Sequence, residues 1–403
     1  MDNRPMDNRV ADIAVLGGGL AGGLIALALA KLRPELHVVV IERGAALGGN
    51  HVWSFFASDL PDGAAELIEP LIAARWDAYE VRFPRRRRRL ATPYCSITSE
   101  RFDAALRKAL PVGAVLTGCA ATQVAADRIE LADGREIAAH AVIDARGTAS
   151  LPHMEGGWQK FVGQLVRTER PHGLERPVVM DATVAQLDGY RFVYCLPFSP
   201  TEVFVEDTYY SDSPDLNAPL LRERIAAYCA AAGWQVAEIL SEETGVLPVV
   251  GRGDWAAYRA ETESAGVALA GVRAGLFHSL TSYSLPDALA FALDLARQSD
   301  LSGTGLAAWS RAWAEGHWRA GWFYRKLTTL LFCAAVPDQR FRVLQRFYGL
   351  KPALIERLYA GETTMADQLR ILSGKPPVPF FTAVATLLGT PPLNPLTAPE
   401  PTA

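Results

Sequence analysis

The stretch VADIAVLGGGLAGGLIALALAKLRPELHVVVIE, residues 10–42, decides the fold of this chain. It begins with an apolar run, 13–16, that does not alternate with polar residues, as is typical of a parallel strand buried on both faces. Gly17, Gly19 and Gly22 follow in the spacing G-x-G-x-x-G. In this motif the first glycine permits a tight turn, the second lets the backbone approach a pyrophosphate, and the third lets a helix pack on the strand.

A helix and a second strand complete the unit. The helix is predicted over 20–32, and the N–H groups of its first turn would face the phosphates of a ligand. The strand over 37–41 ends at Glu42, where a carboxylate can accept hydrogen bonds from a ribose hydroxyl. This order predicts a dinucleotide-binding domain whose candidate cofactor ligands are Gly17, Gly19, Leu20, Ala21, Gly22, Glu42 and Arg43.

The rest of the chain indicates which dinucleotide is bound. A second glycine-rich candidate, 303–308, follows the polar segment 297–302 rather than a hydrophobic strand, so we expect a turn between two helices there. The chain has one dinucleotide-binding motif, near its N-terminus, and the nucleotide domain is interrupted by long inserted segments. This layout favours FAD bound in an extended conformation over NAD alone.

Composition and charge exclude several classes of protein. With 403 residues, 50% of them hydrophobic and 21% charged, the chain can bury a large core and is expected to divide into two or three subdomains. A net charge of −4 gives no general attraction to nucleic acid. The five cysteines lack C-x-x-C spacing, so neither a disulfide framework nor a metal site is predicted, and the cytosol is the expected compartment. The polar start predicts no signal peptide, and no apolar run is long enough to span a membrane.

A run of five arginines, 85–89, follows a predicted strand at 79–83. We expect it to be a solvated strand or turn, because it lacks the aromatic residues that stack on bases; contact with lipid phosphates is the alternative. Earlier in the chain, Gly48 and Gly49 are expected in a loop over the cofactor, and helical patterning covers 62–75.

Further segments belong to the nucleotide domain. A helix over 99–110 would be capped by Ser99. Two further strands are predicted, at 141–147 and at 266–271, and each ends in small residues. These residues would allow close approach to the cofactor. These segments and the earlier loop add Gly49, Asp144, Gly147, Gly271, Leu276, Phe277 and His278 to the candidate cofactor ligands.

From about residue 155 the pattern changes to strands with interleaved aromatic residues, which predicts a separate antiparallel sheet. The strand at 202–209 carries Glu206 and Asp207, which must point to opposite faces, so only one of them can face an apolar cavity. The other strands are predicted at 161–168, 178–181, 190–196 and 241–250, the last with Glu242 and Glu243 before its apolar part.

The predicted fold class is α/β: a Rossmann-like FAD-binding domain of the glutathione-reductase or hydroxylase type, an inserted antiparallel β-sheet domain for the substrate, and a C-terminal helical region. The FAD domain is expected at 10–80, 95–152 and 265–300, the substrate domain at 81–94 and 153–264, the helical region at 301–390, and flexible tails at 1–9 and 391–403. Two apolar segments of the helical region, 327–336 and 378–388, are expected in the core, with docking on a membrane surface as the alternative.

Six motifs together resemble the bacterial-type lycopene beta-cyclases of carotenoid synthesis. They are GGGLAGG at 17–23, IERG at 41–44, VIDARG at 142–147, FVEDTYY at 204–210, GVLPV at 245–249 and RAGLFHSLTSYSLPDALA at 273–290. The fourth and sixth motifs are the most selective. Within the sixth, Ser279 and Ser282 stand where this family usually has Pro and Gly.

The resemblance implies an intramolecular lyase or isomerase that closes beta rings at the ends of lycopene, and of other acyclic or monocyclic carotenoids, without net redox change. Glu206 would be the acid that protonates C2 of the substrate, with a pKa raised by burial. Trp53 and Tyr283 are candidates for cation–π contact with the carbocation. The resemblance also implies reduced FAD, NAD(P)H as a reductant that is not consumed stoichiometrically, and a peripheral position on the inner face of the cell membrane.

Two other classes of function share parts of this pattern. An FAD-dependent monooxygenase or a polyene reductase would share the nucleotide domain but would need hydride delivery and a redox cycle. A non-catalytic isoprenoid carrier would share an apolar groove but would not need Glu206. Oxidation of NAD(P)H without carotenoid would indicate the first class.

Overall fold

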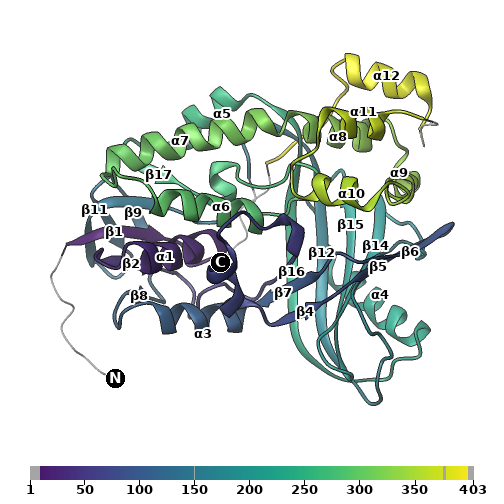
Figure 1. The fold of residues 1–403 in the computed structure, drawn as a ribbon, viewed down its shortest axis with the longest axis horizontal. Helices are drawn as coiled ribbons and strands as arrows, with labels where there is room; N and C mark the ends of the chain where they lie inside the picture. The colour runs from purple at the N-terminus through teal and green to yellow at the C-terminus, as the bar shows by residue number, and fades with distance from the viewer. Residues whose placement is uncertain (1–9, 149, 375–377, 398–403) are drawn as a thin grey trace.

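The computed structural model describes residues 10–148, 150–374 and 378–397, and it contains two large sheets with helices packed around them (Figure 1). The first sheet consists of β1 (Ala11–Leu16), β2 (Val38–Ile41), β8 (Val115–Leu116), β9 (Ala121–Val124), β10 (Arg128–Leu131), β11 (Glu136–Asp144) and β17 (Val267–Leu269). Its seven strands run in the order β8-β2-β1-β11-β10-β9, and β17 pairs with β11 off this path.

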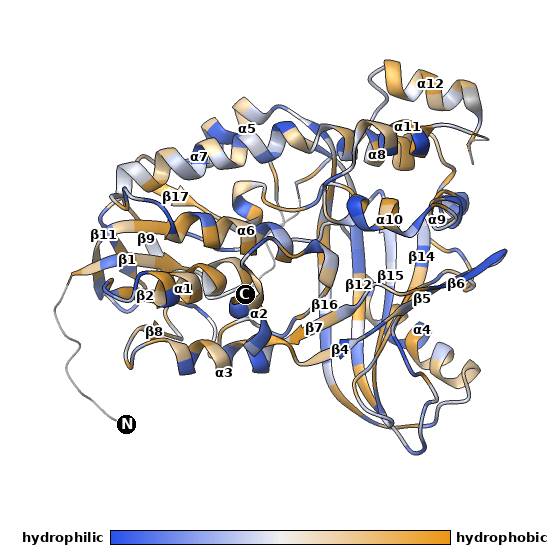
Figure 2. Ribbon diagram, viewed as in Figure 1, coloured by the Kyte–Doolittle hydropathy of each residue, from blue (hydrophilic) through white to orange (hydrophobic). Residues whose placement is uncertain are grey.

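The centre of the first sheet is parallel and buried, as the apolar runs predict. β1 pairs in parallel with β2 on one side and with β11 on the other. After the glycine turn, α1 (Leu20–Leu32) packs beside α6 (Leu285–Ala296), and both helices are largely hydrophobic (Figure 2). The order of strand, turn, helix and strand predicted for 10–42 is therefore confirmed.

The second sheet has eight strands. They are β5 (Tyr79–Phe83), β6 (Arg86–Leu90), β12 (Met154–Thr168), β13 (Val178–Asp181), β14 (Tyr190–Pro197), β15 (Glu202–Ser211), β16 (Val236–Gly253) and β18 (Asn394–Pro395). The path is β16-β12-β15-β14-β13-β5-β6, with β18 on β12. The antiparallel prediction is confirmed for most of it, but β13 and β5 are parallel because β5 arrives from an earlier part of the chain.

The two faces of the second sheet have different coverings. On one face, valines and cysteines pack under α4 (Ala218–Ala231). The other face, which we call the aromatic face, packs its rings against C-terminal helices, chiefly α8 (Trp322–Cys333) and α10 (Pro352–Tyr359). A three-stranded sheet of β3 (Val52–Phe56), β7 (Tyr94–Thr98) and β4 (Ala74–Trp76) lies between the two large sheets in Figure 1.

The remaining helices of the C-terminal half are α5 (Trp255–Thr262), α7 (Gly303–Ala320), α9 (Phe341–Phe347), α11 (Met365–Leu372) and α12 (Phe380–Leu388). Ser302 caps α7, so residues 303–308, predicted as a turn between two helices, instead form the first turns of α7, and the connection from α6 lies before them. The apolar segment 327–336 is largely buried, whereas Phe381 and Leu388 of α12 are each 85% exposed. Within the three described ranges, none of the helices is both long enough and apolar enough to cross a membrane.

Several local predictions were wrong. Thr98 rather than Ser99 caps α3 (Ser99–Ala109), because the Ser99 hydroxyl donates to the carbonyls of Gly48 and His51. The segment 62–75 forms only two short helical pieces, Ala65–Ile68 and Glu69–Leu71, before β4. Pro70 and the early strand leave no room for a longer helix.

Two further segments are longer or more ordered than expected. β16 begins at Val236, so Glu242 and Glu243 lie inside the strand and not before it. Part of the tail predicted as flexible at 391–403 pairs with the second sheet through β18, and Leu396 is fully buried against Leu151 and Met154. The arginines 86–89 lie on an edge strand and are mostly exposed, as predicted.

Candidate active site

The glycine turn after β1 leaves room for a ligand at Gly19 but has no free space at Gly22. Gly17 has φ +99°, which favours glycine. A Cβ on Gly22 would lie 1.9 Å from the carbonyl oxygen of Gly17, so this glycine allows α1 to approach β1. A Cβ on Gly19 would meet no atom within 4 Å. The first turn of α1 also carries no acidic residue, so its N–H groups and positive helix end suit a pyrophosphate.

Glu42 is fixed beside this turn. Its two carboxylate oxygens accept hydrogen bonds from the backbone N–H groups of Gly18 and Gly44, each at 2.7 Å. Leu20 and Ala21 form the first turn of α1, as predicted. Arg43, Gly49 and Gly147 are exposed around the same turn. These residues fit an adenosine diphosphate group, and their role as ligands stays a prediction.

The second group of predicted ligands begins at the same edge of the sheet. Asp144 pairs with Leu16 in register, so it lies directly beside the glycine turn, where Arg146 donates to both of its oxygens. Gly271 follows β17 with φ +62°. Leu276 and Phe277 are buried.

The His278 ring is directed elsewhere. Its Nε2 lies 3.0 Å from the carbonyl oxygen of Leu358 in α10. Burial lowers the pKa of His278 to about 4, so the ring is neutral and held by the protein. Ser282 nearby has φ +58°, the backbone conformation that a glycine at this position would supply.

Glu206 lies at the middle of the second sheet, on the aromatic face. Gly163 of β12 is opposite Glu206 of β15 and also opposite Glu243 of β16. The two glutamate side chains therefore share one face, with their backbones about 10 Å apart, twice the spacing of neighbouring strands. Asp207 points to the other face, as predicted, where Arg191 binds it at 2.9 Å.

The surroundings of Glu206 keep its carboxyl group protonated near neutral pH. The side chain is half-buried, on the face of the sheet that carries the aromatic rings. Burial raises the pKa of Glu206 to about 8, and the charges of Glu243 and Asp207 act in the same direction. A hydrogen bond from the Thr208 hydroxyl opposes this shift. Glu206 is therefore mostly protonated at neutral pH.

Aromatic rings surround this part of the sheet. Tyr194 lies opposite Glu206 on β14, and its hydroxyl is 2.9 Å from that of Tyr94. Tyr283 packs on the same aromatic cluster, with its ring 6.0 Å from that of Tyr359, and burial together with the charge of Glu206 raises the pKa of its hydroxyl. The other predicted aromatic, Trp53, packs instead on the core of the nucleotide domain, with its ring 5.1 Å from that of Phe102. The structure thus brings Tyr283 and Glu206 together, but not Trp53.

Glu243 connects the aromatic face to the nucleotide domain. Its side chain is 7% exposed, and its carboxylate lies 2.9 Å from Nδ1 of His51 and accepts from Val52 N–H, also at 2.9 Å. The sequence did not single out His51, Tyr94 or Tyr194 as site residues. His51 directly precedes β3, Tyr94 lies on β7 and Tyr194 on β14. A single aromatic residue or histidine in the sequence carries no signal of its partners.

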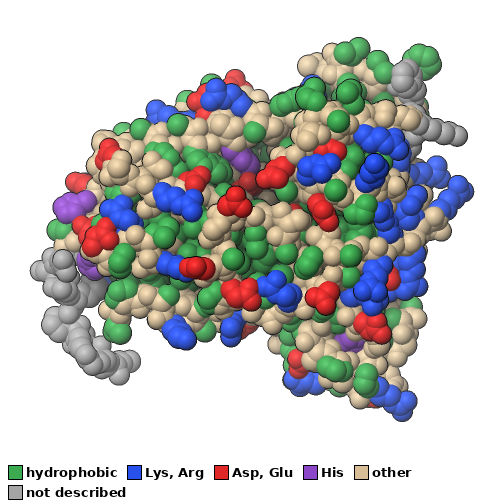
Figure 3. All heavy atoms as spheres, viewed as in Figure 1, with side chains coloured by type: hydrophobic (Ala, Val, Ile, Leu, Met, Phe, Trp, Pro, Cys, Tyr) green, Lys and Arg blue, Asp and Glu red, His purple; other side chains and the backbone are tan. Residues whose placement is uncertain are grey.

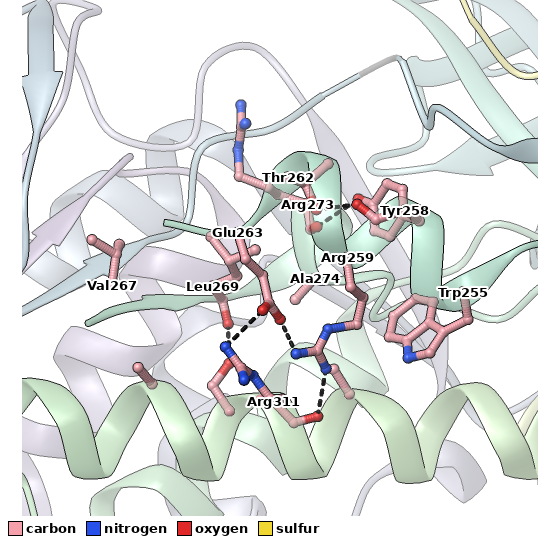
Figure 4. A pocket seen from close by; sticks show the side chains of 13 residues that line it. Trp255, Tyr258, Arg259, Thr262, Glu263, Val267, Leu269, Arg273, Ala274 and Arg311 are labelled. Atoms are coloured by element: carbon pink, nitrogen blue, oxygen red, sulfur yellow. Dashed lines mark hydrogen bonds and ion pairs between the residues drawn. The ribbon is translucent and has the colours of Figure 1, made fainter. Parts of the chain in front are cut away.

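A small pocket lies away from Glu206, between α5, β17 and α7 (Figure 4). It is lined by Trp255, Arg259, Glu263 and Arg311, and Arg311 pairs with Glu263 at 2.7 Å. Its volume of about 20 Å³ holds no more than a water molecule. This pocket is structural, because its charged groups bind one another.

Comparisons with known proteins show the family that this chain is similar to. The family model described as lycopene cyclase protein matches residues 12–385. A lycopene beta-cyclase of Pseudescherichia vulneris is 46% identical over 92% of this chain and 95% of its own length, and one of Pantoea ananas is 42% identical over 94% and 98%.

Solved structures show the same fold at low identity. A geranylgeranyl bacteriochlorophyll reductase-like protein from Thermoplasma acidophilum has a TM-score of 0.61 at 13% identity, over 94% of this chain and 99% of its own. A flavin-dependent brominase has a TM-score of 0.55 at 14% identity, over 88% and 94%. The predicted α/β flavoprotein fold class is therefore confirmed. From the family model and its close relatives, the chain belongs to the lycopene cyclase family.

Proposed function

We propose that this protein is a lycopene beta-cyclase that converts the acyclic ends of lycopene into beta rings, giving beta-carotene through gamma-carotene. The observation that carries the proposal is Glu206, a carboxylic acid on the aromatic face of the second sheet, opposite Tyr194, whose raised pKa keeps it protonated near neutral pH. The names of the bacterial relatives support the same activity. The reaction is an isomerisation, because protons are rearranged and no electrons are transferred.

The residues on the aromatic face suit acid-initiated cyclisation. Glu206 gives its proton to C2 of the substrate, which leaves a cation at C1. Attack by the C5–C6 double bond forms the C1–C6 bond and moves the cation to C5. Tyr194 and Tyr283 belong to the same aromatic cluster, so their rings would stabilise such a cation, and the apolar residues around them would exclude water that would trap it.

The nucleotide domain is proposed to hold FAD in its reduced form, with NAD(P)H as the reductant. The turn of Gly17, Gly19 and Gly22 would bind the pyrophosphate, and Glu42 would bind the adenosine ribose. Reduced FAD supplies negative charge that stabilises a nearby cation. The contact between His51 and Glu243 joins the segment before β3 to β16 of the second sheet, so these residues would lie between the flavin and the aromatic face.

We propose that lycopene enters from a lipid surface on the inner face of the cell membrane. α11 and α12 lie at one end of the molecule, where hydrophobic side chains gather in Figure 3. Met365 and Leu369 of α11 are 69% and 67% exposed, and four residues apart they share one helix face. Leu369→Glu should therefore reduce sedimentation with liposomes, while Glu362→Gln, at an exposed polar position, should not.

Expression in a host that accumulates lycopene, followed by pigment analysis, tests the function directly. Beta-carotene and gamma-carotene are the expected products. The fold likeness to a reductase-like protein favours polyene reduction as the second candidate. Two assays of the purified enzyme separate the candidates. With dithionite-reduced flavin a cyclase forms rings, and with NADPH supplied instead it oxidises no stoichiometric NADPH, whereas one NADPH oxidised per product would identify a reductase.

A further inference from the structure

The arginine-rich hairpin at the edge of the second sheet carries positive charge that the reaction does not use. β6 is an end strand of this sheet, and the side chains of Arg85, Arg86 and Arg89 on its hairpin are exposed. The net charge of the whole protein is −4, so this group of like charges stands out from the rest of the chain. Because the arginines repel one another, an anionic partner would stabilise them.

Contacts with α9 and α11 bring two more arginines to this edge. Arg88 of β6 donates to the carbonyl oxygen of Tyr348 at the end of α9, at 2.8 Å. Arg346 of α9 donates in turn to the carbonyl oxygen of Ile371 in α11, also at 2.8 Å. The five exposed arginines on these three elements, which we call the basic edge, are Arg85, Arg86, Arg89, Arg342 and Arg370.

The basic edge has no acidic counterpart. Among the described residues, none of its five arginines is in an ion pair, whereas Arg87 of the same strand pairs with Glu80 at 3.0 Å. A pair that is already formed offers little charge to a ligand, but an unpaired guanidinium keeps all of its N–H donors free for one. The basic edge is therefore open to an external anion.

Exposed apolar side chains adjoin the basic edge. On α11, Arg370 directly follows Leu369 and stands two residues before Leu372, and both leucines are exposed. Phe381 and Leu388 of the next helix, α12, are exposed as well. In Figure 3, Lys and Arg side chains gather at this side of the molecule, next to the hydrophobic side chains over α11 and α12. One end of the protein thus combines unpaired cations with exposed apolar groups.

This combination fits the boundary of a lipid bilayer. Guanidinium groups bind phosphate oxygens, and apolar side chains beside them can enter the acyl region below the headgroups. A nucleic acid would also bind the arginines, but it would leave the apolar side chains of α11 and α12 in water. The run 85–89 moreover has no interleaved aromatic residues that could stack on bases.

We propose that the basic edge binds the headgroups of anionic phospholipids and so docks this end of the protein on the membrane. The inference rests on the proposed uptake of lycopene from a lipid surface. α9 and α11 pack in the same hydrophobic cluster as the aromatic face and its covering helices α8 and α10. Docking by this end therefore brings the lipid next to the helices that cover the face on which Glu206 lies.

Sedimentation with phosphatidylcholine vesicles, prepared with and without phosphatidylglycerol, tests the proposal on the full-length protein. We expect the unmodified protein to bind the anionic vesicles more tightly, and added NaCl should remove this preference. The double variant Arg85→Gln/Arg89→Gln should bind the anionic vesicles ~25-fold more weakly, because each arginine near an anionic surface contributes about fivefold. The matched control Lys108→Gln/Arg170→Gln removes the same charge at exposed positions elsewhere and should bind like the unmodified protein.

Two further measurements separate docking from other roles of these side chains. Leu369→Glu should weaken binding to both kinds of vesicle, because it changes the apolar part of the surface. With lycopene supplied in detergent micelles instead of vesicles, Arg85→Gln/Arg89→Gln should form rings at the rate of the unmodified enzyme, which shows that fold and chemistry are intact.

The outcomes distinguish this inference from the proposed function. Equal binding of the unmodified protein to both kinds of vesicle, or equal losses in the double variant and its control, would overturn the inference and leave the cyclase function in place. Tighter binding to single-stranded RNA than to anionic vesicles would overturn it in favour of a nucleic-acid partner. A protein that prefers anionic vesicles but forms no rings would instead overturn the proposed function.

Discussion

Glu206 and Glu243 share one face of the second sheet, on either side of Gly163. A Cβ on Gly163 would lie 2.2 Å from the Phe204 ring, so this ring occupies the place where a side chain would separate the two acids. An aromatic ring screens charge poorly compared with water. Burial is the main cause of the raised pKa of Glu206, and the negative charge of Glu243 adds to it.

Glu243→Gln should shift the pH profile of cyclisation without abolishing activity. If the charges are about as far apart as the two backbones, about 10 Å, removal of the Glu243 charge should lower the pKa of Glu206 by ~1 unit at an effective dielectric constant of about 20. Because the acid must be protonated, the loss of activity at high pH should then begin ~1 pH unit lower. Rates from pH 6 to 9 with dithionite-reduced enzyme measure this shift.

The matched control is Glu242→Gln. Glu242 neighbours Glu243 in sequence but lies on the other face, where Arg222 and Gln164 bind it. Glu242→Gln should leave the pH profile of cyclisation unchanged. Equal shifts in the two variants would contradict the electrostatic role of Glu243.

Glu206→Gln should retain bound flavin and accumulate lycopene. The amide keeps the size of the side chain but has no transferable proton, so we expect cyclisation to fall at least a hundredfold. In deuterated water the unmodified enzyme should place one deuteron at C2 of each ring. Glu202→Gln, on the same strand but paired with Arg167 at the surface, is the control and should stay active. Near-normal beta-carotene formation by Glu206→Gln would exclude this residue as the acid.

The same variant should be more stable than the unmodified protein at alkaline pH. The pKa of Glu206 is raised from an ordinary value of 4.5 to about 8 in the folded state, so the unfolded chain loses this proton first. Stability from this group therefore falls as pH rises from about 4.5 to 8. Glu206→Gln should gain on the order of 4 kcal/mol at pH 8 and nothing at pH 4. Urea unfolding at the two pH values measures the difference, and an equal effect at both would contradict it.

Asp207→Asn should impair folding, although Asp207 lies next to the proposed acid. Asp207 is fully buried and Arg191 is 6% exposed, so the variant leaves an unpaired charge in the interior. We expect a loss of about 3–5 kcal/mol in the free energy of unfolding. Glu202→Gln breaks an exposed pair and should cost less than ~1 kcal/mol. A stable but inactive Asp207→Asn enzyme would instead indicate a direct role in catalysis.

The sequence predicted the parts of this site that depend on local pattern. The glycine spacing, the apolar runs around it and the alternation at Glu206 and Asp207 each follow from nearest neighbours in the chain, and the structure agrees with all three. Pairing across the sheet has no such local signal. Gly163 is 43 residues from Glu206 along the printed sequence, so its position between the two glutamates follows only from the register of β12.

The sequence did not reveal His51, Tyr94 and Tyr194 as site residues for the same reason: their partners are distant in the sequence. His51 contacts Glu243, which is 192 residues away in the sequence, and Tyr94 contacts Tyr194, which is 100 residues away. The cap of α3 shows the same limit on a smaller scale. Ser99 has the composition of a cap, but its hydroxyl is used by carbonyls of a loop 48 and 51 residues away in sequence.

Gly19 and Gly22 should fail for different reasons when each is replaced by alanine. Gly19 has φ −70°, which any residue adopts, and its Cβ would meet no protein atom within 4 Å. Gly19→Ala should therefore fold normally and bind FAD weakly, because only the ligand would contact the added methyl group. Gly22→Ala would place a Cβ 1.9 Å from the Gly17 carbonyl oxygen, so α1 must move away from β1. We expect it to lose more than ~2 kcal/mol of stability even without flavin.

Flavin absorbance of the purified proteins and urea unfolding after flavin removal separate the two effects. Gly316→Ala is a suitable control, since Gly316 lies within α7 with open space around its Cα and should gain ~1 kcal/mol of stability with flavin binding unchanged. Full flavin content in Gly19→Ala would place the pyrophosphate elsewhere, because a group bound against this turn must contact the new methyl. Loss of folding in Gly19→Ala would show that the space at Gly19 serves the protein and not a ligand.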